Sequence, residues 1–267
     1  MIAVPRVRAQ TFMQKMLSGR TEPSLFTCRA DDGQYQDYVV KPYSKLGSGI
    51  ICEFFAALVG RHLGLPIPPI AIVEIDPRLV GTIPCPETRE LLAQDEGPHF
   101  GSLHKTGGFA PLPIGFSISA ILIPRALDIF AFDMLIQNPD RSNEPGRGKP
   151  NLLCNGHEFV IFDHELAFSF LADIDPSPQP WELRGLPFVR HHIFCVQLMR
   201  YADSHDLSFE IFLSRVMELS DSILSEMVSA MPENWRNPTN SSKIVSHLRT
   251  ARDNIERFDR GLREALA

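Results

Sequence analysis

The sequence predicts an α+β fold, with a small β-rich N-terminal lobe over residues 1–76 and a mostly helical C-terminal lobe over residues 77–267. Three observations favour this class. Short apolar runs separated by turn residues dominate the first lobe, whereas apolar residues at helical spacing dominate the chain from about residue 190 onward. Repeated βαβ units are not evident. The length of 267 residues suits one two-lobed domain.

The N-terminal lobe is predicted to hold a hairpin, one helix and a further strand. Residues 2–16 mix apolar and basic side chains and could form a strand before the polar loop Ser18–Ser24. Apolar residues at positions 51, 54, 55, 58 and 59 form the stripe of an amphipathic helix. The expected strands and helix are Leu25–Arg29, Gln36–Lys41, Ile50–Leu63 and Ile70–Ile75.

The C-terminal lobe is predicted to be helical around one long buried helix, Ile118–Ile136. Pro124 either kinks this helix or lies in its first turn. The other expected helices are Glu87–Ala93, His191–Ala202, Leu207–Leu219, Ser222–Met231 and Lys243–Leu266.

One stretch that follows the long helix carries the polar residues of greatest interest. Two apolar runs, Leu152–Cys154 and Phe159–Phe162, are separated by Asn-Gly, which is a strong hairpin signal. Asn151 then starts one strand and Asp163 ends its partner, so antiparallel pairing brings the two side chains together. Such oxygen ligands can hold Mg²⁺. Asp140, in the loop before them, could orient a hydroxyl for attack, and this order of parts is that of a kinase catalytic site.

Two residues of the N-terminal lobe fit the same chemistry. Lys41 ends an apolar strand, and a lysine there is commonly an edge residue that faces water. Glu53 lies in the first turn of the next helix, where an acid ordinarily compensates the helix dipole. Together the two residues could instead form an ion pair that holds the lysine on nucleotide phosphates.

Composition sets limits on the protein's partners and surroundings. The formal net charge of −6 gives no support for bulk attraction to nucleic acid or to an anionic membrane. No apolar run reaches the roughly 20 residues that span a bilayer. The five cysteines are scattered and form no C-x-x-C pair, which favours a reducing cytoplasm over a disulfide framework.

These residues give the chain a resemblance to a known family. Val39-Val40-Lys41-Pro42, Asn138-Pro139-Asp140-Arg141, Pro150-Asn151-Leu152-Leu153 and Ile161-Phe162-Asp163-His164-Glu165 resemble motifs of the HipA-like kinases. These kinases are bacterial members of the protein-kinase-like superfamily and are distantly similar to phosphatidylinositol kinases. The resemblance runs from about Ser18 to Phe168 and implies a two-lobed protein-kinase-like fold that uses ATP and Mg²⁺.

The resemblance also implies roles for single residues. Lys41, paired with Glu53, binds nucleotide phosphates; Asp140 is the catalytic base; and Asn151 and Asp163 are the metal ligands. The loop residues implied to cover the phosphates are Ser18, Gly19, Thr21 and Ser24.

Some assignments stay open at this point. Asn143 is a rival to Asn151 as metal ligand, because the spacing of 11 residues from Asp140 to Asn151 exceeds that of protein kinases. Arg141 adjoins Asp140 and could stabilise transferring phosphate, whereas Arg147 and Lys149 fit a solvated basic loop equally well.

The resemblance leaves more than one function open. The expected activity is transfer of the γ-phosphate of ATP to a Ser/Thr hydroxyl of a protein or of the chain itself. The alternatives are a nucleotide-binding pseudokinase and a phosphoinositide-kinase-like enzyme. A protein substrate is the expected partner, and an antitoxin-like partner is possible.

Overall fold

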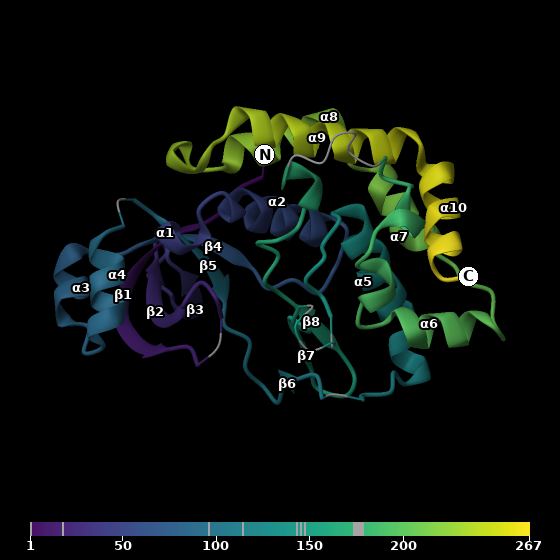
Figure 1. Ribbon diagram of the computed structural model, residues 1–267. Coiled ribbons are helices and arrows are strands. Elements are labelled where there is room, and N and C mark those ends of the chain that lie inside the picture. Colours follow the sequence, from purple (N-terminus) through teal and green to yellow (C-terminus); the bar gives the residue numbers. More distant parts are fainter. Residues whose placement is uncertain are drawn as a thin grey trace.

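The computed structural model describes residues 2–17, 19–95, 97–113, 115–142, 144, 146, 148–172 and 179–267 (Figure 1). Three residues singled out in the sequence, Ser18, Asn143 and Arg147, lie outside this described part. The described part combines a β-rich N-terminal region with a helical C-terminal region, which confirms the broad class expected from the sequence.

Five strands of the N-terminal region close into a barrel in the order β1-β2-β3-β5-β4. The barrel is antiparallel except where β1 meets β4. Buried apolar residues of the strands fill its interior, among them Val7, Phe26 and Val40. The strands are β1 (Arg6–Lys15), β2 (Ser24–Ala30), β3 (Tyr35–Lys41), β4 (Ile70–Glu74) and β5 (His99–Leu103).

Strand β5 lies beyond the lobe boundary that the sequence suggested after Asp76. It pairs with both β3 and β4, so the barrel extends to Leu103 and that boundary cuts through it. The strand was missed because it has only five residues and contains Gly101. This glycine is needed, since a Cβ there would stand 2.5 Å from Val73 Cγ2. Helices α3 (Pro77–Thr82) and α4 (Pro86–Ala93) separate β4 from β5, and α4 confirms the short helix expected there.

Helix α2 (Gly49–His62) follows the short helix α1 (Tyr43–Leu46) and packs where the two regions meet (Figure 1). Every residue from Ile50 to Gly60 is buried. Such a helix has no solvent face of its own, because the barrel covers part of it and the C-terminal helices cover the rest. The apolar stripe seen in the sequence therefore understates how enclosed this helix is.

The C-terminal region begins with α5 (Ile123–Leu135), whose first turn contains Pro124. This settles the position of Pro124 in favour of the helix start, where a missing N–H costs nothing. The single helix expected at Lys243–Leu266 is two helices that meet at Asn254. The further helices are α6 (Cys195–Ala202), α7 (Glu210–Met217), α8 (Asp221–Ala230), α9 (Pro238–Asp253) and α10 (Ile255–Ala265). Short 3₁₀ helices are η1 (Ala120–Leu122), η2 (Ser169–Ala172), η3 (Leu183–Gly185), η4 (Val189–His191) and η5 (Glu233–Trp235).

The hairpin predicted around Asn-Gly is present. Strands β7 (Leu152–Cys154) and β8 (Phe159–Ile161) pair antiparallel, and β6 (Ala110–Pro111) adds a third strand. The Phe162 amide donates to the Asn151 carbonyl, which extends the pairing by one step. Asn151 and Asp163 consequently lie at the same end of the hairpin, as the sequence predicted. Within the described residues, no helix has the length and apolar character that crossing a membrane requires.

Gly60 tests how tightly α2 is enclosed. A Cβ at this position would meet the Ile67 side chain and stand 2.8 Å from Phe132 Cζ on α5. We expect Gly60→Ala to lower the free energy of unfolding by about 1–3 kcal/mol, because overpacking outweighs the gain in helix propensity. The control is Gly81→Ala in α3, where nothing lies within 4 Å, and which should be neutral or stabilising by up to about 1 kcal/mol. Equal effects in urea unfolding would contradict this picture.

Candidate active site

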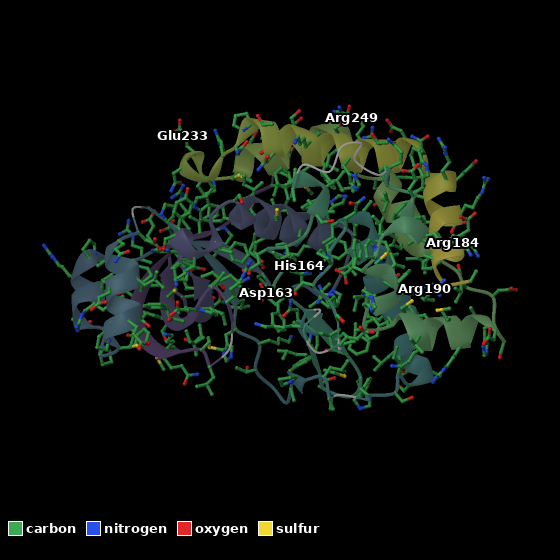
Figure 2. All side chains as sticks on the ribbon, in the orientation of Figure 1. Asp163, His164, Arg184, Arg190, Glu233 and Arg249 are labelled. Carbon is green, nitrogen blue, oxygen red and sulfur yellow. The ribbon has the colours of Figure 1, made fainter. Side chains whose placement is uncertain are left out.

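Lys41, at the end of β3, is the central cation of the site. Its Nζ lies 2.9 Å from Glu53 Oε2 on α2 and 2.6 Å from Asp163 Oδ1 after β8. Asp163 and the next residue, His164, lie between the barrel and the helical region (Figure 2). The sequence predicted that Lys41 would reach Glu53, or Asp163 in its place, and the structure has both contacts. Two elements that are close in the chain and a segment 122 residues beyond Lys41 therefore meet at one ammonium group.

A third carboxylate, Glu165, completes the surroundings of Lys41. Its Oε2 lies 3.5 Å from Lys41 Nζ, and ligand atoms of Glu53, Asp163 and Glu165 all fall within 4.8 Å of one another. Sequence reasoning missed Glu165 as a site residue. Its position two residues after Asp163 gave no usable signal, because the left-handed backbone at Asp163 breaks the alternation of sides that a strand would have.

Charge and burial act against each other in this cluster. Burial alone would lower the pKa of Lys41, but the surrounding carboxylates outweigh it and hold that pKa above its usual value. Burial likewise opposes ionisation of Asp163, yet the Lys41 ammonium keeps the pKa of Asp163 below its usual value. Burial raises the pKa of Glu53, and Lys41 offsets this only in part. The lysine is thus firmly charged, and of Glu53 and Asp163 it is Asp163 whose charged form is favoured.

The loop between β1 and β2 also reaches this cluster. Arg20, whose side chain is largely exposed, donates from Nη2 to Glu165 Oε1 at 2.9 Å. The Met16 amide donates to the Pro23 carbonyl and closes the base of the loop. Two of its implied phosphate-covering residues, Gly19 and Thr21, line the adjacent cleft. Ser24 does not; it is the first residue of β2, where pairing with Val40 buries it in the barrel.

Asp140 and Asn151 form the second half of the site. Asn151 Nδ2 donates to Asp140 Oδ2 at 2.7 Å and approaches the Asp163 carbonyl at 3.5 Å. Burial raises the pKa of Asp140, and the hydrogen bond from Asn151 partly offsets the rise. The amide nitrogen is thereby turned toward Asp140, so the Asn151 side-chain oxygen is the atom that can meet a cation.

The backbone at the two expected metal ligands has an uncommon conformation. Asn151 has φ of 45° and Asp163 has φ of 62°, both in the left-handed region. Asn and Asp tolerate this region better than other residues with a Cβ, but it still costs on the order of 1–3 kcal/mol. Strain of this kind persists where surrounding contacts over-determine it, and such positions cluster at functional sites.

Arg141 does not face this site. Its side chain is fully buried, and all five guanidinium N–H groups have acceptors: Asp133, the carbonyls of Pro150 and Asn151, and His164. No donor remains for a phosphate, which corrects the expectation that Arg141 stabilises transferring phosphate. Instead it ties α5 to the start of β7 and so fixes Asn151.

The two histidines around this arginine are structural. His164 accepts from Arg141 Nη2 at 2.9 Å, and burial, helped by Arg141, lowers the pKa of His164 to about 3. His192 Nε2 lies 3.0 Å from Asp133 Oδ2 and donates to it. Burial would raise the pKa of Asp133, but Arg141 and His192 hold it well below its usual value. This charged network lies beneath the loop that carries Asp140.

The loop from Asp140 to Lys149 is closed by its own backbone. The Lys149 amide donates to the Asp140 carbonyl at 2.8 Å, and the Ser142 amide donates to the Lys149 carbonyl at 3.0 Å. Gly148 has φ of 143°, and a Cβ there would collide with the Asp140 carbonyl oxygen, so glycine is required. Lys149 is exposed and lines the cleft, whereas Asn143 and Arg147 lie outside the described residues.

A cleft of about 360 Å³ joins the two halves of the site. Lys41, Glu53, Asn151 and Asp163 line its polar end. Its apolar walls include Val39, Leu103, Phe109, Leu153, Val160 and Phe162. A larger groove of about 560 Å³ adjoins this cleft at Leu103 and Val160 and is lined by none of these polar residues. A half-open cleft with both apolar and charged side chains in its lining suits a ligand that has both characters.

The residues of the polar end fit a nucleotide with Mg²⁺. Asp163 and Asn151 offer a carboxylate and an amide oxygen, which are the ligand types that Mg²⁺ takes. Lys41 offers a firmly charged ammonium at the same end of the cleft. The cluster of Glu53, Asp163 and Glu165 is close enough to share a cation, and Lys41 Nζ lies within 3.5 Å of all three.

Comparison with protein families assigns the chain to one of them. A model of the HipA-like kinase family matches residues 9–261, so the chain belongs to the HipA-like kinases. A search of curated proteins by sequence found no match. The chain is similar to a crystal structure of a Helicobacter pylori proinflammatory kinase, CtkA, with 14% identity and a TM-score of 0.47 over 90% of this chain and 95% of that one. It is also similar to a MAP kinase of Leishmania major, with 11% identity and a TM-score of 0.25 over 96% of this chain and 82% of that one.

The buried role of Arg141 can be tested by removing its charge. We expect Arg141→Met to lower the free energy of unfolding by about 3–5 kcal/mol, because Asp133 is left as a buried charge without its main partner. The control is Arg249→Met, which removes an exposed ion pair to Asp221 and should cost less than about 1 kcal/mol. If thermal or urea unfolding gave similar losses for both variants, the buried network would not have the importance assigned to it.

Proposed function

We propose that this protein is an ATP-dependent phosphotransferase of two-lobed, protein-kinase-like fold that phosphorylates a Ser/Thr hydroxyl of a protein or of its own chain. One observation carries the proposal: Lys41 is held between Glu53 and Asp163 at the polar end of a cleft, beside the hydrogen-bonded pair Asp140 and Asn151. Kinase sites require this combination of a phosphate-binding lysine, metal ligands and a carboxylate base.

Each residue has a distinct part in the proposed reaction. Lys41 binds nucleotide phosphates, and Glu53 keeps its ammonium in place. Asn151 and Asp163 are the metal ligands, and Asp140 accepts the proton of the attacking hydroxyl. When bound, ATP with Mg²⁺ supplies the γ-phosphoryl group and neutralises its charge.

The loop between β1 and β2 has a proposed share in nucleotide binding. Gly19 and Thr21 line the same cleft as Lys41, and their proposed role is to cover the bound phosphates. The chain has no G-x-G-x-x-G sequence in this loop, so charge from Arg20, next to Glu165, can supplement backbone donors. This makes phosphate contact depend on a side chain as well as on the backbone.

The substrate proposed here rests on family membership and on the acceptor chemistry of Asp140. A carboxylate base suits an alcohol acceptor, and HipA-like kinases resemble enzymes that act on protein hydroxyls. A protein substrate is therefore the proposal, and an antitoxin-like partner stays a prediction. Incubating the protein with radiolabelled ATP and Mg²⁺, alone and then with a cell lysate, tests self-labelling and labelling of other proteins.

Two acidic substitutions separate the proposed roles. Asp163→Asn should abolish transfer and weaken Mg²⁺-dependent ATP binding, since it removes a charged metal ligand. Asp140→Asn should slow transfer by about 10²–10⁴-fold while leaving ATP binding nearly intact, because its contact acts chiefly in the transition state. Labelling rates and the ATP-dependent rise in melting temperature measure the two effects.

Asn151→Ala serves as the milder companion of Asp163→Asn, with partial rescue by Mn²⁺ expected. Asn143→Ala should have little effect, and loss of activity in that variant alone would move the ligand assignment to Asn143. Wild-type transfer rates in Asp140→Asn would overturn the central role given to Asp140. A melting temperature unaffected by millimolar ATP with either metal would count against nucleotide binding altogether.

A further inference from the structure

The segment between α8 and α9 reaches back from the C-terminal region to the barrel side of α2 (Figure 1). This segment contains η5, whose last residue, Trp235, is only 3% exposed. The Trp235 ring meets the Phe54 ring edge to face, with centroids 5.9 Å apart and planes at 77°. Phe54 directly follows Glu53 on α2. The tryptophan therefore packs on the turn of α2 that carries the partner of Lys41.

Two hydrogen bonds join the same segment to the N-terminal region. Trp235 Nε1 donates to the Pro98 carbonyl at 3.1 Å, just before β5. Tyr43 Oη donates to the Asn234 carbonyl at 3.2 Å, and Tyr43 lies two residues after Lys41. The turn thus contacts chain neighbours of both members of the Lys41–Glu53 pair.

The turn itself is held in shape. Arg236 donates from Nε to the Met231 carbonyl at 3.0 Å and from Nη2 to the Ser229 carbonyl at 3.1 Å. These two bonds tie the end of the turn to the end of α8. Asn237 then caps the start of α9. Trp235 is consequently presented on a short rigid support rather than on a loose loop.

The position of α2 matters because the contacts of Glu53 depend on it. Glu53 Oε2 receives Lys41 Nζ at 2.9 Å and the His164 amide at 2.8 Å. A buried ion pair has to recover a large desolvation cost, and it does so only when its geometry is well fixed. The helix has contacts with Trp235 near its start and with Arg215 at its end, where Nη1 of Arg215 donates to the Leu63 carbonyl.

From these contacts we infer that Trp235 is a positioning residue: the turn at η5 fixes α2 and thereby holds Glu53 against Lys41. The inference rests on the proposed function, in which this pair binds nucleotide phosphates. The turn between two C-terminal helices provides the contact that fixes the position of α2. The Lys41–Glu53 ion pair therefore forms when the C-terminal region packs on this helix.

A matched pair of tryptophan variants tests the inference, since the chain has two tryptophans. Trp181 is half-buried near α10, where Arg257 lies over its ring at 4.1 Å. The variants are Trp235→Ala, Trp235→Phe and, as the control, Trp181→Ala. Amide hydrogen exchange of residues 49–62 and the KM for ATP and kcat are measured where each variant is fully folded by circular dichroism.

We expect Trp235→Ala to speed amide exchange in α2 by about tenfold or more and to raise the KM for ATP by a similar factor, since local opening releases Glu53. Trp235→Phe keeps the ring contact and should retain most of the protection. Trp181→Ala should lower the melting temperature while leaving α2 exchange and the KM unchanged. If Trp235→Ala does not fold, Tyr43→Phe removes one contact of the turn and should raise α2 exchange to a smaller degree.

The inference is overturned if a folded Trp235→Ala, or Tyr43→Phe in its place, keeps wild-type exchange in α2, because the tryptophan would then serve only general stability. The same holds if Trp181→Ala loosens α2 as much as Trp235→Ala does. Exchange requires no activity, so these results stand even if the wild-type protein neither binds ATP nor transfers phosphate. A wild-type protein without ATP binding or phosphate transfer would reject the proposed function. The role of Trp235 in positioning α2 would then be judged from the amide exchange rates alone.

Discussion

The ion pairing of the buried Lys41 ammonium with carboxylates is the interaction on which the arrangement of the two regions depends. An unpaired charge in this position would be prohibitively costly, so carboxylates must be brought to it. Glu53 comes from α2, while Asp163 and Glu165 follow β8. Because these carboxylates come from α2 and from the segment after β8, satisfying the charge of the lysine requires the barrel, α2 and the hairpin to be packed together. Folding and assembly of the site are in this sense one event.

A second buried charge holds the other half of the site. Arg141 binds the carbonyl of Asn151 and pairs with Asp133, so it fixes the point where the backbone turns into β7. The left-handed backbone at Asn151 and Asp163 is maintained by such contacts rather than by local preference. The two networks meet at His164, whose backbone amide binds Glu53 while its ring accepts from Arg141. Displacement of either network would therefore shift Asn151 and Asp163, the proposed metal ligands.

Local patterns in the sequence predicted the elements that carry the site, and contacts distant in sequence account for what they missed. The Asn-Gly hairpin and the α2 stripe are local signals: they placed Asn151 and Asp163 at one end of the hairpin and Glu53 on α2, although Glu53 lies after the first turn of that helix. Strand β5 has no such signal, because Gly101 is dictated by contact with Val73 on the neighbouring strand β4. The burial of Arg141 could not be read from its place beside Asp140, since its partner Asp133 lies inside an apolar helix that reads as uniform core. The boundary expected after Asp76 leaves β5 out of the N-terminal region for the same reason, since this strand has no local sequence signal.

The burial of α2 explains why the site cannot belong to the N-terminal region alone. Its buried residues join the same apolar core as α5 and the C-terminal helices, whereas the barrel interior forms a separate, smaller core. A helix apolar on all sides is unstable unless both of its surroundings are present. The barrel could therefore keep Lys41 on its strand without the C-terminal helices, but Glu53 would lose the support that aims it. The apolar surface of α2, more than the site residues themselves, makes the two regions interdependent. Trp235 packs on Phe54 of this helix, next to Glu53 of the ion pair.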